Sequence, residues 1–153
     1  CILGTIGGPS RMDGTVIADA VNLAARIEGM TKRYGARIVL GEATVARLSH
    51  DYSLREVDLV AVKGKLAPVA LYEVLDGEPA LTRAQKLRTR DEFAAAMACF
   101  RARAWSEAEA GFSACEAAAP SDGAAKLYLA RCRLLRANDP GPGWDGVMRM
   151  AEK

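Results

Sequence analysis

The chain has 153 residues, of which 50% are hydrophobic and 26% are charged, and its formal net charge is +2. This length fits one medium globular domain or a small domain with an appendage, and no apolar run approaches the roughly 18 residues that cross a bilayer. With no signal peptide visible and no clustering of Lys and Arg, the sequence predicts a cytoplasmic location, with no nucleic-acid surface and no membrane segment in these 153 residues. A membrane anchor in N-terminal segments of the parent protein stays an open alternative.

The first elements predict a hairpin followed by a helix. Two β-like runs, CILGTIG at residues 1–7 and RMDGTVIA at residues 11–18, flank turn residues. Asp19 fits the N-cap of a helix that is broken near Gly29 and closed by Gly35. Because the chain opens on an apolar strand-like run without a methionine, we expect the polypeptide to begin inside a domain.

The following elements predict a sheet packed against helices. RIVL at residues 37–40 predicts a short buried strand, and EATVARLSH at residues 42–50 predicts a short helix. LREVDLVAVKG at residues 54–64 and PVALYEVL at residues 68–75 predict two strands joined by a tight KGK turn. The first part is therefore expected to have an α+β fold.

The composition changes near DGEP at residues 76–79, and the chain from about residue 80 to 137 has an almost wholly helical pattern. Two amphipathic helices are predicted to meet near Ala104 and Trp105, and a third is predicted at residues 124–137. The change near residues 76–79 therefore predicts that an α+β part is followed by a helical part.

The helical part shows the spacing of a tetratricopeptide repeat. Ala108, Phe112, Cys115 and Pro120 fall where such a repeat places small, aromatic, small and proline residues. Since only about one and a half repeats fit, we expect this segment to pack on the first part or on a partner. In the turn-rich tail that follows, Trp144 is expected to act as an anchor.

The cysteines and the histidine predict no metal site. Cys1, Cys99, Cys115 and Cys132 form no C-x-x-C pair, and no histidine lies at metal-ligand spacing from them. Reduced core thiols are expected. His50, the only histidine, is expected in a loop or at a helix end rather than as a catalytic base.

One stretch, DAVNLAARIEGM at residues 19–30, places polar side chains on an apolar helix. Asn22 and Arg26 are one turn apart and share a face. A guanidinium and an amide together suit a phosphate and a neighbouring sugar oxygen, and Lys63 in VKGK is a second cation. Taken singly, each has an ordinary alternative: a solvated Asn, a surface Arg and a basic turn.

Taken together, these motifs resemble a known family. LGTIGGPSRMDGTVIADAVNLAARIEGMTKRYGARIVLGEATVARL, followed by VAVKGKLAPVALYEVL, resembles the C-terminal half of the catalytic domain of class III adenylate/guanylate cyclases, especially bacterial ones. The resemblance covers about residues 1–75. It implies a partial ferredoxin-like cyclase sandwich at residues 1–77. The helical pattern and the repeat spacing described above predict a linker or helix start at residues 78–90 and a tetratricopeptide-like helical hairpin at residues 91–153.

The resemblance also implies roles for single residues. Asn22 would orient the ribose, and Arg26 would stabilise charge on the α-phosphate as the ribose 3′-oxygen attacks it. Lys63 would hold the terminal phosphates. Thr15 matches the base-recognition position, where a threonine favours ATP over GTP. The expected reaction is conversion of ATP to cyclic AMP and pyrophosphate.

The family's site forms between two catalytic domains, which implies a homodimer. Its two Mg²⁺ or Mn²⁺ ions are held by aspartates in the N-terminal half of the domain, which we expect upstream, so residues 1–153 alone are expected to be inactive. Asp13 and Asp19 are expected to belong to the hairpin and the N-cap instead. Gly14 and Ala18 depart from the tyrosine and glycine usual in the bacterial pattern.

Two other functions stay open. A catalytically silent cyclase-homology module could serve as a regulatory or dimerisation partner, and it would lack the metal aspartates and the adenine-reading lysine upstream. Alternatively, the helical tail could be a scaffold that binds a protein partner, although few repeats are present.

Overall fold

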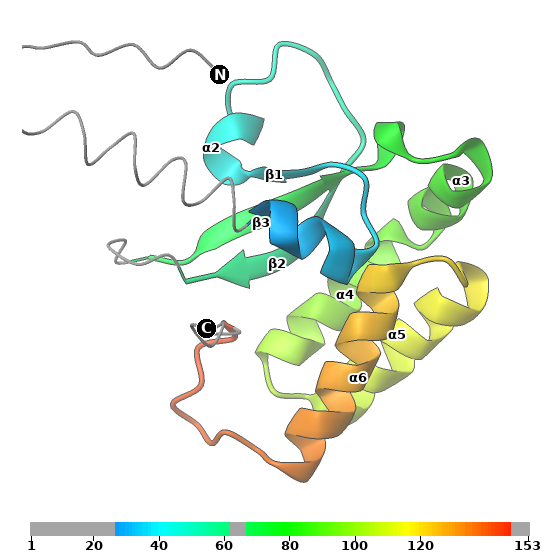
Figure 1. Cartoon of the computed structure of the whole chain (residues 1–153). Helices are drawn as coiled ribbons and strands as arrows, with labels where there is room; N and C mark the ends of the chain where they lie inside the picture. The colour runs from blue at the N-terminus through cyan, green and yellow to red at the C-terminus, as the bar shows by residue number, and fades with distance from the viewer. Residues whose placement is uncertain (1–26, 62–66, 148–153) are drawn as a thin grey trace, which may run out of the picture.

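The computed structural model describes residues 27–61 and 67–147 (Figure 1). The predicted hairpin at residues 1–18, the N-cap Asp19 and the KGK turn lie outside these ranges. None of the helices within the described ranges combines the length and the apolar character needed to cross a membrane.

The described elements form a small antiparallel sheet followed by helices, which confirms the predicted α+β class. A helix covers residues 27–34. It is followed by β1 (Val39–Gly41), α2 (Glu42–Val45), β2 (Leu54–Val60), β3 (Val69–Val74), a 3₁₀ turn (Leu75–Gly77), α3 (Ala80–Arg88), α4 (Arg90–Arg101), α5 (Trp105–Ala118) and α6 (Gly123–Ala137). The order within the three-stranded sheet is β1-β3-β2, so β3 lies in the middle.

The helix over residues 27–34 does not break at Gly29, and that prediction was wrong. Ile27 is partly buried, and Met30 and Tyr34 are fully buried, at spacings that place them on one face. Packing of this face outweighs the roughly 1 kcal/mol that a mid-helix glycine costs relative to alanine. Gly35 ends the helix with a φ of 59°, as predicted for a C-terminal glycine.

The strands β2 and β3 pair from Leu54 opposite Val74 to Val60 opposite Val69. The register shifts between Glu56 and Asp58, which marks a β-bulge. As a result, Val57 and the adjacent Asp58 are both buried, although alternation would place them on opposite faces. A carboxylate therefore enters the interior of the molecule.

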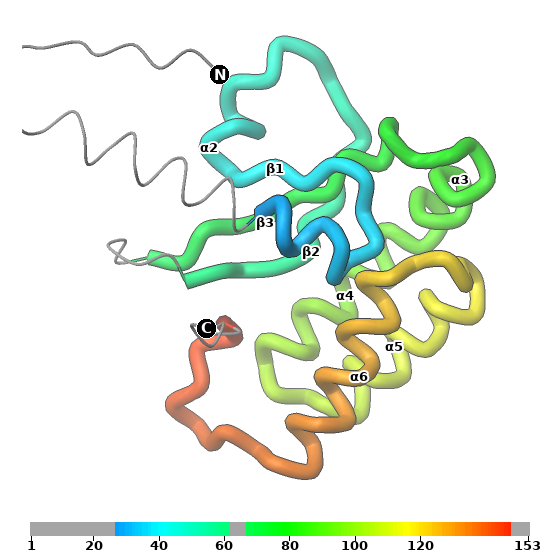
Figure 2. Tube along the Cα trace, viewed as in Figure 1, coloured from blue at the N-terminus to red at the C-terminus, as the bar shows by residue number. Residues whose placement is uncertain are grey.

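The helices α4, α5 and α6 lie side by side and match the predicted helical part (Figure 2). One hydrophobic core runs from the helix over residues 27–34 and the sheet into these helices, so the helical segment packs on the first part. Trp144 anchors the tail as predicted: its ring centroid lies 5.2 Å from that of Phe100 and 5.0 Å from that of Trp105. The division near residues 76–79 stays a prediction about domain organisation.

Candidate functional site

The four site residues assigned by the resemblance, Thr15, Asn22, Arg26 and Lys63, all lie outside the described residues. Arg26 directly precedes the described helix, and Lys63 lies in the connection between β2 and β3. The structure describes the segments that flank them. These flanks determine where the two stretches join the fold.

The flanking segments converge beside Gly41, at the end of β1. A Cβ at Gly41 would lie 3.8 Å from Cδ1 of Ile27 and 3.8 Å from Cγ1 of Val69. Ile27 is the first described residue after Arg26, and Val69 is the first residue of β3. The described segments that follow residues 1–26 and 62–66 thus meet at neighbouring points of the fold.

A hollow of about 370 Å³ lies at the same place, between the described helix, β1 and α2. Its lining is largely apolar, with Glu28 and Arg37 as the charged members. Pockets that hold small molecules combine an apolar lining with a few polar groups. The lining residues are Ile27, Glu28, Thr31, Arg37, Ile38, Val39, Leu40, Gly41 and Thr44.

A buried ion cluster, which we call the Arg55 cluster, ties the sheet to the helical part. Arg55 of β2 lies 2.6 Å from the carboxylate of Glu73 on β3 and 2.6 Å from that of Asp122, just before α6. Lys86 of α3 lies 2.5 Å from the other oxygen of Glu73 and 3.2 Å from Glu78. All of these side chains are at most 5% exposed. Each buried charge is paired, as burial requires.

Asp122 has two tasks in this cluster. Its Oδ1 accepts hydrogen bonds from the backbone N–H groups of Ala124, at 3.1 Å, and of Ala125, at 3.3 Å, which makes it the N-cap of α6. Burial alone would raise the pKa of Asp122, but the hydrogen bonds and positive charge of Arg55, with help from Lys86, hold this pKa below its ordinary value. The carboxylate is therefore ionised at neutral pH.

This lowered pKa predicts acid sensitivity. The unfolded chain binds the proton more readily than the folded one, so the stabilisation by Asp122 is present above its ordinary pKa of 3.8 and is lost as the pH falls through the lower folded value. We expect urea unfolding at a series of pH values to show this loss. In Asp122→Asn the slope of stability against pH should be smaller in that window; an equal slope in both proteins would contradict the assignment.

A second buried group, the Asp58 cluster, joins the described helix to α6. The hydroxyl of Tyr34 donates to Oδ2 of Asp58 at 2.7 Å, and Nη1 of Arg131 donates to the same oxygen at 3.0 Å. Burial, followed by the charge of Asp58, raises the pKa of Tyr34 above its ordinary range, so the phenol stays protonated and donates. The guanidinium of Arg131 also lies 4.7 Å from the ring centroid of Tyr128.

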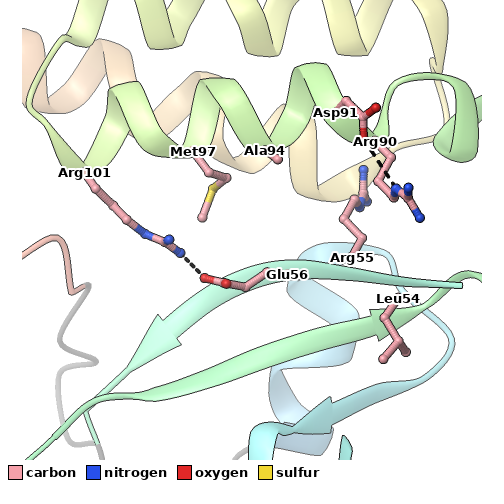
Figure 3. Close-up of a pocket in the computed structure, with 8 residues that line it drawn as sticks. All are labelled: Leu54, Arg55, Glu56, Arg90, Asp91, Ala94, Met97 and Arg101. Atoms are coloured by element: carbon pink, nitrogen blue, oxygen red, sulfur yellow. Dashed lines mark hydrogen bonds and ion pairs between the residues drawn. The ribbon is translucent and has the colours of Figure 1, made fainter. Parts of the chain in front are cut away.

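A second hollow of about 240 Å³ separates β2 from α4 (Figure 3). Arg101 reaches across it to form an ion pair with Glu56, and Arg90 lies 3.5 Å from Asp91. Since Arg55 is paired within its own cluster, each of the three arginines that line this hollow already has a carboxylate partner. The hollow therefore has the chemistry of a packing contact rather than of an anion site.

The described residues hold few groups suited to covalent or metal chemistry. No set of three or more His, Cys, Asp or Glu side chains within residues 27–61 and 67–147 could hold a metal ion. Cys115 and Cys132 are buried free thiols, and burial raises their pKa values to about 11 and about 12. They are protonated core residues, as the sequence predicted.

The two ion clusters were missed by the sequence analysis, although one signal was present. Along β2, Arg55 stands two residues before the buried Val57, so strand alternation places this arginine on the inward face. A charged residue in an inward position indicates a buried partner. The identity of that partner, Asp122, is not visible in the sequence pattern because 67 residues separate the two.

Comparison with known proteins finds three adenylate cyclases. No family model and no solved structure matches the chain. The chain is 34% identical over 134 residues to the terminal-differentiation specific adenylate cyclase of Dictyostelium discoideum, and this match covers 86% of the chain and 6% of that protein. It is 51% identical over 76 residues to the adenylate cyclase of Anabaena cylindrica and 32% identical over 74 residues to adenylate cyclase 1 of Rhizobium meliloti (strain 1021).

The matches to the Anabaena and Rhizobium enzymes each cover 48% of the chain, and they cover 15% and 11% of those two proteins, respectively. The chain therefore spans between 6% and 15% of the length of the three relatives. Since the Dictyostelium match is longer than residues 1–77, it extends into the helical part.

Proposed function

This chain is homologous to adenylate cyclases, and we propose that residues 1–77 form the C-terminal half of a class III cyclase catalytic domain. The reaction is conversion of ATP to cyclic AMP and pyrophosphate, a phosphorus–oxygen lyase reaction in intracellular signalling. The observation that carries this proposal is the 51% identity over 76 residues to the Anabaena enzyme. Because the reaction consumes ATP, we place the domain in the cytoplasm.

In this proposal each site residue has one task. Asn22 orients the ribose, and Arg26 stabilises the charge that develops on the α-phosphate. Lys63 holds the terminal phosphates, and Thr15 contacts the adenine. The convergence of Ile27 and Val69 beside Gly41 supports this arrangement, because the stretches that carry Arg26 and Lys63 adjoin neighbouring points of the fold.

The family resemblance implies a two-metal site for Mg²⁺ or Mn²⁺. The buried carboxylates of the described residues do not fit it, because Asp58, Glu73 and Asp122 are each paired with an arginine or a lysine. We therefore propose that the metal ligands come from the N-terminal half of the catalytic domain. We also propose that the complete site forms between two such domains in a homodimer, so residues 1–153 alone are inactive.

The helical part is proposed to be a tetratricopeptide-like extension that binds a protein partner. Ala108, Phe112 and Cys115, at three positions of the repeat pattern, are fully buried on one side of α5. This burial supports the likeness, because a repeat uses these positions for packing between its helices.

The test is cyclase activity of the intact protein with Mn²⁺ and ATP, then GTP, for the unaltered protein and for Asn22→Ala. We expect cyclic AMP from the unaltered protein and a large loss of kcat in the variant. Absence of activity with either nucleotide, in a sample shown to be folded and dimeric, would leave the silent regulatory module as the function.

Thr15→Cys is expected to change the preference for the base. Loss of a hydroxyl that contacts the adenine removes one hydrogen bond, which corresponds to about a ten-fold fall in kcat/KM for ATP relative to GTP. The measurement is kcat/KM with both nucleotides, and Ser113→Cys is the control because it exchanges a hydroxyl for a thiol at an exposed position of α5. An unchanged ratio in Thr15→Cys would remove Thr15 from the base site.

A further inference from the structure

The chain after α6 turns back and packs over the connection between α4 and α5 (Figure 1). Trp144 lies against Phe100, near the end of α4, and against Trp105, the first residue of α5, with ring centroids 5.2 and 5.0 Å away. The centroids of Phe100 and Trp105 are themselves 5.5 Å apart, and both residues are buried. We call the surface that these two rings offer to Trp144 the aromatic seat, and residues 138–147 the tail.

The tail is a short irregular peptide that is held by few side chains. Residues 138–147 contain no helix or strand. Trp144 is partly buried and Val147 is fully buried, whereas the other side chains of the tail are exposed, namely those of Asn138, Asp139, Pro140, Pro142 and Asp145. Local opening costs least where few apolar contacts are buried, so the tail can leave the aromatic seat while the helices stay folded.

Arg103, in the connection under the tail, has an unusual backbone conformation. Its φ of 62° lies in the left-handed region, which non-glycine residues rarely adopt. The backbone N–H groups of Arg103 and Ala104 donate back into α4, the pattern of a helix end at which glycine is usual. An arginine at this point indicates a use for its side chain, which pairs with Asp139 of the tail at 2.6 Å. The two side chains are 28% and 46% exposed, so this pair is a surface clasp that can open.

From these observations we propose that the aromatic seat is the docking site for a partner protein and that the tail blocks it in the free chain. The inference rests on the proposed function of the helical part as a partner-binding extension, and it names the surface and the chemistry of the partner. The segment seated there is Pro-Gly-Pro-Gly-Trp at residues 140–144. The partner that fits the seat therefore carries a tryptophan that follows turn residues such as proline and glycine. Tryptophan is among the residues that contribute most to binding at protein interfaces.

The tail competes with such a partner because it is tethered beside the aromatic seat. A segment on a short flexible linker acts at an effective concentration of about 1 mM. The apparent affinity for the partner is reduced to the extent that the seat is filled. A partner therefore binds weakly until Trp144 leaves the seat, and the contact between the tail and the seat is autoinhibitory.

The test measures binding of a fluorescein-labelled peptide with the sequence of residues 138–147 to the intact protein, by fluorescence anisotropy. We expect the peptide to bind Trp144→Ala at least about ten-fold more tightly than the unaltered protein, because the tethered tryptophan no longer competes. A peptide with alanine in place of its tryptophan is the control and is expected to bind neither protein. Absence of binding to Trp144→Ala, equal affinities for the two proteins, or equal binding of the two peptides would overturn the inference.

Asp139→Asn tests the same contact with Trp144 left in place. Loss of the clasp to Arg103 is expected to tighten peptide binding about two- to three-fold, whereas the control Asp91→Asn, which removes an exposed charge 3.5 Å from Arg90, should leave it unchanged. Equal affinities in these two variants would overturn the blocking of the seat by a clasped tail. Dimers of the unaltered protein that disappear in Trp144→Ala would assign the tail to the seat of a second copy and would also overturn the inference. Cyclase activity is not the readout, so each of these outcomes leaves the cyclase function as it stands.

Discussion

Replacing Asp122 with alanine is expected to lower the free energy of unfolding by about 3–5 kcal/mol, because removal of one partner leaves a buried charge uncompensated. Arg55 loses the two hydrogen bonds of 2.6 and 2.9 Å that it donates to Asp122, and α6 loses its N-cap. The arginine cannot turn to water, since its side chain is 1% exposed. Urea unfolding of the 153-residue chain measures the loss.

Asp91→Ala is the matched control for this measurement. Asp91 also stands near the start of a helix beside an arginine, but its side chain is 96% exposed and lies 3.5 Å from Arg90. Exposed ion pairs contribute about 0–1 kcal/mol, so this variant should unfold nearly as the unaltered protein does. A loss in Asp122→Ala no larger than that in Asp91→Ala would show that the Arg55 cluster does not hold the helical part on the sheet.

Arg26→Ala is expected to lower kcat of the intact protein by about 10²–10³-fold, the range found when one preorganised donor to a transition-state charge is removed. The guanidinium is proposed to meet charge that is absent from bound ATP, so KM should change little. Steady-state assays with Mn²⁺ and ATP measure both constants.

Arg47→Ala controls for the loss of an arginine from the surface, since Arg47 is exposed and follows α2. Its kcat should equal that of the unaltered protein. If Arg26→Ala also retained full kcat, Arg26 would have no role in the chemical step, whereas a rise in KM alone would make it a binding residue.

The elements that local pattern determines could be predicted from the sequence. Strand alternation and Val-rich runs predicted β2 and β3, and the helical period predicted α4, α5 and α6. The predicted helix break at Gly29 was wrong because helix propensity describes only the local sequence. The helix continues through Gly29 because Met30 and Tyr34 are buried against the sheet and the helices.

For the candidate site, the motif residues could be predicted from the sequence, but the long-range contacts could not. Thr15, Asn22, Arg26 and Lys63 came from motif resemblance and remain predictions, since they lie outside the described residues. The residues that join the two parts of the chain could not be predicted. The contact from Asp58 to Arg131 spans 73 positions, and the bulge that turns Asp58 inward has no sequence signal of its own.

The adjacent residues Asp122 and Gly123 meet two unrelated demands at one point of the chain. The aspartate must supply a carboxylate to Arg55 and to the first turn of α6, and the glycine must leave room for the carbonyl of Tyr34. An asparagine at position 122 would not supply the carboxylate, and an alanine at position 123 would place its Cβ against the carbonyl of Tyr34. In this chain, the Asp-Gly pair is thus the point at which the charge pairing of Arg55 and the close approach of α6 to the described helix are both decided.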